Sequence, residues 1–555
     1  MYLRTSKSKT ADGQKVTYYY LAHNERDPNT GVSKANIIHN FGRADDVDRQ
    51  DLVRLCSSIA KVCGLEVNDM FSGNAATKRN ALPKGVKQLE TWPLGTVWVI
   101  EALWDRLDIG PELRNIQKEN KYRIAYERAL LAETANRMCE PESKLGVWDR
   151  WLDRVYLPSS KGLKLAQMYE AMDMLHENAE RIEEAVFFKT ADLLNLEVDV
   201  IFYDTSTFEF SIDYADEDDD LRQLGHSKQG TWTPQVVVAL AVTREGIPVR
   251  SWVFPGNTSD VDTVKRVKED LRGWKLGRAL FVGDSAMNSE ANRERLARAC
   301  GTYLLAVRSG SLKEVQQKVL NRPGRYRKIA DNLKVKEVII GTGVKRRRYI
   351  LCFNPKEAKR QALHRKQVLI EIKQKLSEHQ SHWATAKWAI ELMASKRYGR
   401  YLKVDCGEVV INQAAIKKEK RMDGKWVVTT NDDTLSLEDA ATGYKNLLVI
   451  ERCFRTLKRT QISMSPMHHW LPRRIEAHVK ICVLALLIER VAEVATGMSW
   501  SRIRRELDRI QVTEYKNDSY HFFQRNELPT KAGEILKKLE ISAPKTVLGV
   551  SEAKK

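Results

Sequence analysis

The feature that most constrains the fold is a change in hydrophobic period near residue 197. Before it, apolar side chains recur at helical spacing, as at Val97, Ile100 and Leu103. After it, short β-branched and aromatic runs alternate with helical segments up to about residue 300. Strands and helices in this order predict a mixed sheet with flanking helices, an α/β layer domain.

Individual elements follow from this alternation. Residues 198–212 predict either a hairpin or one long strand with its neighbour. The other expected strands cover 235–242, 248–254 and 279–283, and the expected helices cover 97–107, 122–138, 163–194, 263–272, 289–300, 355–380, 444–458 and 475–495.

Charge and hydropathy exclude several classes of protein. The chain has 92 Lys and Arg against 73 Asp and Glu, a net charge of +19, which is typical of proteins that bind a polyanion. The longest apolar run, 481–488, is much shorter than the roughly 20 residues that cross a bilayer, and no apolar signal segment opens the sequence. The eight cysteines include no Cys-x-x-Cys pair, so we expect reduced, packed thiols and no structural zinc. These features predict a cytoplasmic protein with a nucleic-acid partner.

Two aspartates follow apolar strands. Asp204 comes after residues 200–203, and Asp284 comes directly after 279–283. Ligands of open α/β sheets bind near the carboxyl ends of strands, so both are candidate ligand-binding residues. The plainer alternative for Asp284 is that it caps the helix that follows.

A third acid lies in a helical segment. Tyr444, Glu451 and Lys458 are seven residues apart, which predicts one helix face over about 21 Å, and Arg452 and Arg455 add positive charge. A solvated Glu–Lys pair is the alternative, although seven residues is too far for a good ion pair. The spacing better suits one long ligand, with the carboxylate near a metal and the ammonium near phosphates.

Four segments resemble one family. FYDTSTFEF (202–210), FPGNTSD (254–260), FVGDSAMNS (281–289) and YKNLLVIERCFRTLK (444–458) look like the DDE insertion-sequence transposases with an RNase H-like core and a Tyr-Arg-Glu-Lys signature helix. The likeness covers roughly 197–490. Leu447 occupies the signature's arginine position, so either Arg452 or Arg455 replaces that phosphate contact or the contact is missing.

The resemblance implies a catalytic triad of Asp204, Asp284 and Glu451 that holds two Mg²⁺ ions, for which Mn²⁺ can substitute. Such a site cleaves transposon ends and transfers the 3′-hydroxyl to target DNA by in-line phosphoryl transfer. The implied partners are the element's own terminal inverted repeats, target DNA and a second copy in a synaptic homodimer, at a bacterial nucleoid. An RNase H-like nuclease that cuts without joining and a silent DNA-binding protein are the alternatives. Clustered acids argue against the last, because they repel phosphate.

The expected domains run along the chain as follows. A small β-hairpin unit with a helix covers 1–67, a linker 68–87 and a basic helical DNA-binding module 88–196, for which a plain helical scaffold is the alternative. The resemblance implies an RNase H-like core in two parts, 197–302 and 441–495, separated by a β-rich insertion at 303–440. Residues 496–555 form a C-terminal region that is a candidate for dimerisation.

Several other residues are candidate DNA contacts. Trp426 lies 25 residues before Glu451, where related transposases stack a flipped base on an insertion-domain tryptophan, and a strand aromatic in a core is the alternative. We expect the basic runs 345–348 and 417–421 to contact DNA, with a solvated surface as the alternative. The acidic run 216–220 predicts a solvated turn, and no catalytic site is expected at His468, His469 and His478.

Overall fold

The computed structural model describes most of the chain, and its described ranges are 2–9, 15–26, 33–43, 86–210, 220–226, 232–298, 301–308, 315–342, 346–379, 383–465 and 467–552. The chain divides into two compact units, Met1–Lys84 and Gly85–Lys555. The helix expected at 47–64, most of the linker and nearly all of the acidic run lie outside the described residues.

The first unit contains an antiparallel sheet of three strands, β1 (Tyr2–Lys9), β2 (Lys15–Arg26) and β3 (Ser33–Arg43), in the order β1-β2-β3. The sequence predicted a hairpin here. The predicted hairpin corresponds to β2 and β3, and the structure adds β1, which pairs with β2 along residues 2–9.

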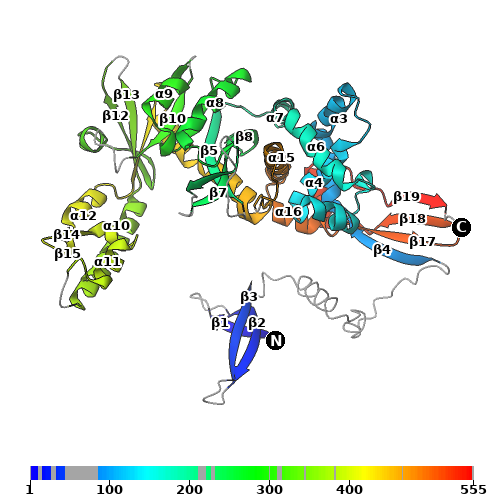
Figure 1. Ribbon diagram of the computed structural model, residues 1–555, viewed down its shortest axis with the longest axis horizontal. Coiled ribbons are helices and arrows are strands. Elements are labelled where there is room, and N and C mark those ends of the chain that lie inside the picture. Colours follow the sequence, from blue (N-terminus) through cyan, green and yellow to red (C-terminus); the bar gives the residue numbers. More distant parts are fainter. Residues whose placement is uncertain are drawn as a thin grey trace. The chain divides into compact units, whose positions relative to one another are not determined.

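The second unit is built on a ten-stranded mixed sheet (Figure 1). Its strand order is β11-β12-β13-β16-β10-β9-β5-β7-β6, with β8 paired to β7. The strands β5, β9 and β10 are parallel, and the other pairs are antiparallel. The bounds are β5 (Val200–Glu209), β6 (Gln223–His226), β7 (Trp232–Val242), β8 (Pro248–Pro255), β9 (Leu280–Gly283), β10 (Tyr303–Val307), β11 (Arg327–Ala330), β12 (Leu333–Ile340), β13 (Arg347–Phe353) and β16 (Lys425–Thr430). The mixed α/β class predicted from the sequence is confirmed.

Two expectations change in this sheet. Within the segment 198–212, residues 200–209 form one long strand, β5, and the hairpin alternative is wrong. Sheet pairing also continues across the boundary expected at residues 302/303, because β10 lies parallel to β9. Strands of the expected insertion therefore extend the same sheet as the core.

Helices cover both faces of the sheet. On one face, α8 (Asp260–Gly273) and α9 (Glu290–Ala297) contribute to a core with Ile201 and Tyr203 of β5. On the other, α13 (Leu437–Lys445), α14 (Leu448–Arg455) and α15 (Pro472–Thr496) share a core with Phe202 and Phe208. Successive side chains of a strand point to opposite faces, which is why the odd and even residues of β5 separate in this way.

Residues 95–193 form a helical layer that packs on α15. Its main helices are α2 (Gly95–Arg106), α3 (Ile109–Glu119), α4 (Tyr126–Cys139), α6 (Leu165–Glu177) and α7 (Ala179–Leu193), with a short α5 (Lys144–Gly146). The helix expected at 163–194 is interrupted at Asn178, which lies between α6 and α7. Because α4 and α6 pack against α15, this layer shares one hydrophobic core with the sheet domain.

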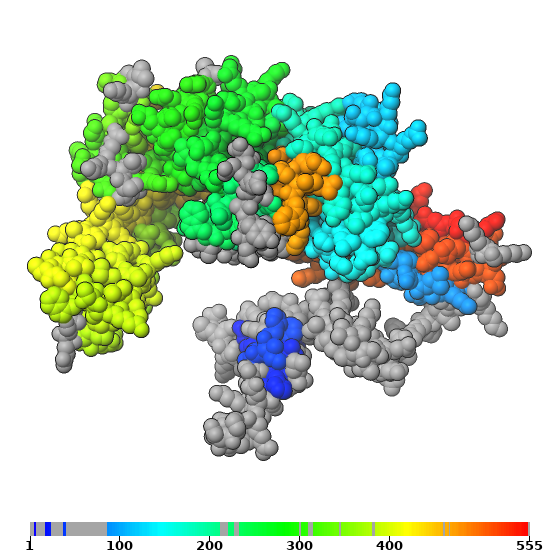
Figure 2. Space-filling view, in the orientation of Figure 1, coloured from blue at the N-terminus to red at the C-terminus, as the bar shows by residue number. Residues whose placement is uncertain are grey.

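Two further parts complete the second unit. Between β13 and β16, the helices α10 (Pro355–Ser377), α11 (Lys387–Ala394) and α12 (Gln413–Lys420) and the hairpin β14 (Leu402–Asp405) and β15 (Glu408–Ile411) surround a small core of their own. The C-terminal part consists of α16 (Trp500–Leu507), β17 (Gln511–Lys516), β18 (Tyr520–Arg525), α17 (Thr530–Lys538) and β19 (Val547–Glu552). Its strands form a sheet with β4 (Lys87–Pro93), and Figure 2 shows the orange and red C-terminal segment beside blue β4.

Within the described residues, no helix combines the length and apolar character needed to cross a membrane. Of the described cysteines, Cys139, Cys352, Cys453 and Cys482 are buried, and Cys406 is exposed.

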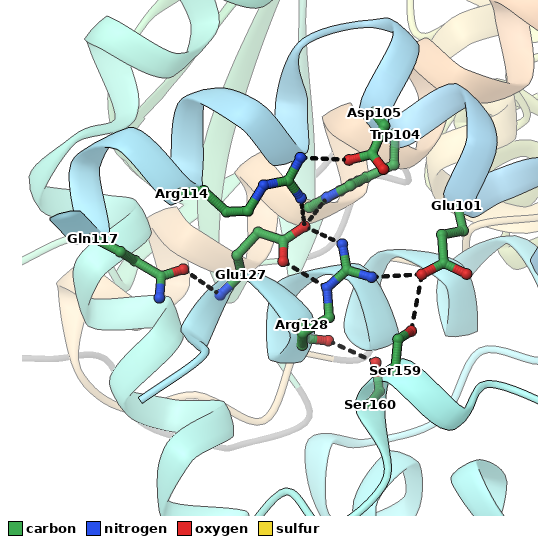
Figure 3. Close-up of polar contacts among 9 residues, drawn as sticks. All are labelled: Glu101, Trp104, Asp105, Arg114, Gln117, Glu127, Arg128, Ser159 and Ser160. Atoms are coloured by element: carbon green, nitrogen blue, oxygen red, sulfur yellow. Dashed lines mark hydrogen bonds and ion pairs between the residues drawn. The ribbon is translucent and has the colours of Figure 1, made fainter. Parts of the chain in front are cut away.

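A buried carboxylate ties the helical layer together (Figure 3). Glu127 of α4 is 3% exposed and accepts hydrogen bonds from Trp104 Nε1 at 2.7 Å and from Arg128 Nε at 2.6 Å. Arg114 of α3 lies 3.3 Å from the same carboxylate, and Arg128 also binds Glu101 of α2. One side chain therefore links three helices.

We expect Glu127→Ala to lower the free energy of unfolding by about 3 kcal/mol, because it leaves the buried Trp104 indole without its acceptor and removes one of the two carboxylates that bind the Arg128 guanidinium. Urea unfolding followed by circular dichroism measures this loss. Asp331→Ala is the control, since Asp331 forms only an exposed ion pair with Lys328 and its removal should cost less than about 1 kcal/mol. Equal losses for the two variants would contradict the role given to Glu127.

Candidate active site

Two parallel strands place Asp204 and Asp284 side by side. Phe202 of β5 is in register with Val282 of β9, and each aspartate lies two residues further along its strand direction. Parallel strands are about 4.8 Å apart, and residues two apart share a face. Both carboxylates therefore lie on the α14 side of the sheet, next to each other.

The position of each aspartate differs in detail from the expectation. Asp204 lies inside β5, opposite Leu240 of β7, and not beyond the strand's end. Asp284 does follow β9, and its side chain accepts a hydrogen bond from the Ser285 backbone at the start of the short turn η5 (Ser285–Met287). The helix-capping alternative is thus present in the structure, for a single turn, and it leaves the carboxylate facing a pocket.

The segment 444–458 is not one helix, and that prediction is wrong. Tyr444 belongs to the last turn of α13, Glu451 to α14, and Lys458 to the wider-wound segment η10 (Thr456–Thr460). The chain turns at residues 446–447 because α13 packs on β10, β12 and β13, whereas α14 packs on β5 and β7. A sheet twists from strand to strand, so one straight helix cannot follow both regions.

The three segments nevertheless meet at one open pocket of about 670 Å³. Its lining residues are Asp204, Ser206, Thr207, Phe208, Glu209, Asp284, Tyr444, Leu447, Glu451, Phe454, Arg455, Lys458 and Ser465. The structure therefore brings together the three predicted acids with the predicted tyrosine and lysine, from positions up to 254 residues apart (458 − 204).

The negative charge of the pocket affects the pKa of Tyr444. Burial, followed by the negative charges of Asp284, Glu451 and Asp204, raises the pKa of the Tyr444 hydroxyl to about 12. All three carboxylates thus lie close enough to act on one hydroxyl. That hydroxyl stays protonated at neutral pH and can donate a hydrogen bond.

Known families match both units of the chain. Residues 201–488, more than half of the 555, match the transposase DDE domain, and residues 3–68 match the N-terminal domain of the IS1634 family transposases. The chain belongs to the DDE-type insertion-sequence transposases. The family resemblance noted from the sequence is confirmed.

Solved structures of transposases show a weaker likeness. The piggyBac transposase synaptic complex with hairpin DNA has 10% identity and a TM-score of 0.35, over 75% of this chain and 78% of that one. The Mos1 transposase paired-end complex with the left transposon end has 14% identity and a TM-score of 0.12, over 46% and 66%. Likenesses of this size carry no argument about the transposase described here. No curated protein matches it significantly.

The transposase's carboxylates have the right chemistry for a hard divalent cation, which prefers oxygen ligands. DDE transposases as a family generally use divalent metal ions. Within the described residues, however, no three His, Cys, Asp or Glu side chains gather into a group that could hold a metal ion. Asp204, Asp284 and Glu451 share an open pocket.

Two arginines of α14 differ in their relation to the pocket. Arg455 is among its lining residues, whereas Arg452 is not, although the side chains of both are exposed. Leu447, at the position where the family signature has arginine, is buried in the pocket wall. Lys458 places its ammonium 5.1 Å from the centre of the Phe208 ring.

Sequence reasoning missed a fourth acid of the pocket, Glu209, together with Ser206. Both lie on β5, in the quoted segment FYDTSTFEF. The signal was the length of that strand, since a strand continuing past Asp204 carries its next residues along the same pocket.

Trp426 is not brought to this pocket. It lies on β16, is half-buried and packs against the main core, with the Lys445 ammonium 5.7 Å from its ring centre. This matches the strand-aromatic alternative. The basic run 345–348 also has a structural role, since Arg346, Arg347 and Arg348 each pair with a carboxylate.

The histidines line a second hollow of about 430 Å³ with Arg137 and Lys144. Burial and these nearby cations lower the pKa of His469 to about 3 and hold that of His478 well below its usual value. Both rings are therefore neutral, and neither serves as a general acid near pH 7.

Proposed function

We propose that the pocket lined by Asp204, Asp284 and Glu451 is the active site in which this transposase cleaves transposon ends and transfers the 3′-hydroxyl to target DNA. The observation that carries the proposal is the parallel register of β5 and β9, which sets the two aspartates side by side in the pocket that Glu451 also lines. The family match over 201–488 covers all three residues.

Metal ions have a defined place in this proposal. Asp204, Asp284 and Glu451 would hold two Mg²⁺ ions, and the ions would supply charge stabilisation at phosphorus and activation of water or a 3′-hydroxyl. DNA phosphates and cations would together favour a closer arrangement of the three acids. The cations would offset the negative charges of the carboxylates and of the phosphates.

The remaining polar residues of the pocket position DNA. Tyr444 donates a hydrogen bond to a phosphate oxygen, since its hydroxyl keeps its proton. Arg455 and Lys458 supply positive charge at the same wall. Phe208 and Phe454 form an apolar surface beside them, which keeps the electrostatic contacts away from bulk water.

Arg455→Ala is expected to slow cleavage at limiting DNA by about tenfold, as loss of a charged hydrogen bond costs about 1.5 kcal/mol. Arg452→Ala removes the same charge one turn away and should have little effect. Single-turnover rates with end-bearing DNA compare the two. Equal slowing would show that Arg455 acts through general charge alone.

The larger architecture is part of the same proposal. The strands β5, β7, β8 and β9 with their helices form an RNase H-like core from 197–302 and 441–495, and β10 extends its sheet beyond residue 302. A homodimer, with 496–555 as a candidate contact, joins two ends for cutting. The protein's DNA partners are its terminal inverted repeats and its target, and they place it at the bacterial nucleoid.

One experiment separates this function from its alternatives. The purified protein is incubated with Mg²⁺ and DNA carrying the ends of its own element. Joined products support the transposase mechanism, cut products alone support a nuclease, and a shifted band alone supports a DNA-binding protein.

A further inference from the structure

Another hollow, different from the one lined by the histidines, lies in the sheet domain and is lined by cations. It measures about 380 Å³, and its lining residues are Lys268, Arg272, Lys275, Gly277, Arg278 and Arg298. We call it the basic hollow. The end of α8, the turn before β9 and the end of α9 supply its side chains. Every side chain in the lining is therefore positively charged, apart from the glycine.

These charges are not neutralised within the described part of the chain. None of the five forms an ion pair with a described carboxylate. By contrast, Arg250, which also lies near α8, pairs with Glu180 and Asp270. Lys268 is buried and donates to the Gly277 carbonyl at 2.7 Å, and burial together with the charge of Arg272 lowers its pKa. Like charges held this close favour an anion between them.

Helix chemistry explains one of these residues but not the set. A cation in the last turn of a helix interacts favourably with the free carbonyl groups there, which accounts for Arg272. Lys275 and Arg278 lie beyond the end of α8, and Arg298 comes from the end of α9. Side chains from three separate segments thus bring positive charge to the basic hollow.

Lys275 occupies a position that favours glycine. Its φ is 62°, the N–H of Lys275 bonds to Arg272 O at 3.0 Å, and the N–H of Leu276 bonds to Leu271 O at 2.9 Å. This is the common left-handed helix ending, where a side chain is strained and glycine is usual. The chain therefore keeps a lysine where backbone conformation alone would select against it.

The basic hollow and the active-site pocket lie on opposite faces of the sheet. Lys268 belongs to α8, which packs on the face of Tyr203, whereas Asp204 and Asp284 face α14. Arg278 precedes β9 and Asp284 follows it, so six residues of chain separate them by at most about 20 Å. One stretch of DNA at the carboxylates does not fill the basic hollow as well.

We infer that the basic hollow binds the phosphodiester backbone of a second stretch of DNA. The inference rests on the proposed function for the identity of the polyanion as DNA. Phosphate oxygens would accept hydrogen bonds from Lys275, Arg278 and Arg298, whose side chains are exposed at the rim. The contacts carry charge and no base-specific geometry, so binding there is independent of sequence.

The test is the salt dependence of binding to a random-sequence DNA duplex. Each phosphate contact contributes about 0.9 to the slope of log affinity against log salt. Lys275→Gly should lower the slope by about 0.9, and Arg278→Gln with Arg298→Gln should lower it by about twice that. Because glycine suits the backbone at residue 275, the thermal midpoint of Lys275→Gly should stay equal or rise, which separates lost binding from misfolding.

Lys328→Gln is the charge-matched control. Lys328 is an exposed lysine of β11, and it forms an ion pair with Asp331 at 2.8 Å. The slope should not change in this variant. Equal changes for Lys328→Gln and Lys275→Gly, or none for Lys275→Gly, would overturn the inference.

Two further measurements identify the ligand and distinguish failure of this inference from failure of the proposed function. Millimolar inorganic phosphate at constant ionic strength should not displace the duplex, and displacement that depends on Lys275 would show a small-anion site instead. Wild-type protein that cleaves end DNA while its Lys275 variant keeps the full slope refutes only this inference. Wild-type protein that neither binds nor cleaves DNA refutes the proposed function as well.

Discussion

Replacing any one of Asp204, Asp284 and Glu451 by its amide is expected to slow Mg²⁺-dependent strand cleavage by at least about 10³-fold, since losing several kcal/mol of charge stabilisation has that effect. Binding of end DNA should persist, because the amides keep the size of the side chains and remove only charge that repels phosphate. Single-turnover cleavage and gel-shift assays on the same protein preparations measure the two quantities.

Glu209→Gln is the matched control for this result. Glu209 lines the same pocket. It is an odd-numbered residue of β5, however, whereas Asp204 and Ser206 are even-numbered and share the other face of the strand. We expect its amide to slow cleavage by less than about tenfold. Full cleavage by Glu451→Gln would refute the assignment of the triad.

The second large effect concerns stability. Lys144 Nζ and the Glu133 carboxylate lie 2.8 Å apart, and both side chains are almost fully buried. Breaking a buried pair by removing one partner costs about 3–5 kcal/mol, whereas replacing both with apolar groups costs little. Glu133→Leu should therefore be much less stable than the double variant Glu133→Leu with Lys144→Met. Urea unfolding of the three proteins measures this, and additive losses would contradict it.

The pH dependence of Glu133→Leu gives an independent check. Burial lowers the pKa of Lys144 below its unfolded value, and removing Glu133 takes away the charge that opposes this shift. The folded variant then binds fewer protons than the unfolded chain at neutral pH, so its stability should rise as the pH is raised toward 10. A flat profile between pH 7 and 10 would show that Lys144 finds another partner.

Local periodicity was enough to predict the sheet domain. The runs at 235–242 and 279–283 are apolar and bounded by turns, and both became strands close to the expected limits. For 198–212, alternation fits a hairpin and a long strand equally well, and only pairing with β7 along residues 202–209 decides between them. Pairing of β4 with β17 joins residues more than 400 positions apart, for which local patterns contain no signal.

The candidate site was likewise only partly predictable from the sequence. Its residues could be named because each of Asp204, Asp284 and Glu451 follows or interrupts an apolar run. The turn at residues 446–447 could not be predicted, since the spacing of Tyr444, Glu451 and Lys458 is that of an uninterrupted helix. The basic hollow was also invisible, because Lys268, Arg278 and Arg298 share no periodic pattern and meet only after folding.

The proposed mechanism requires the three acids of the open pocket to close around metal when DNA is bound. Crystals of the protein with end DNA, soaked in Mn²⁺, test this through anomalous diffraction. We expect an anomalous peak coordinated by oxygens of Asp204, Asp284 and Glu451. A DNA-bound pocket without such a peak, or a peak held by other residues, would contradict the central claim.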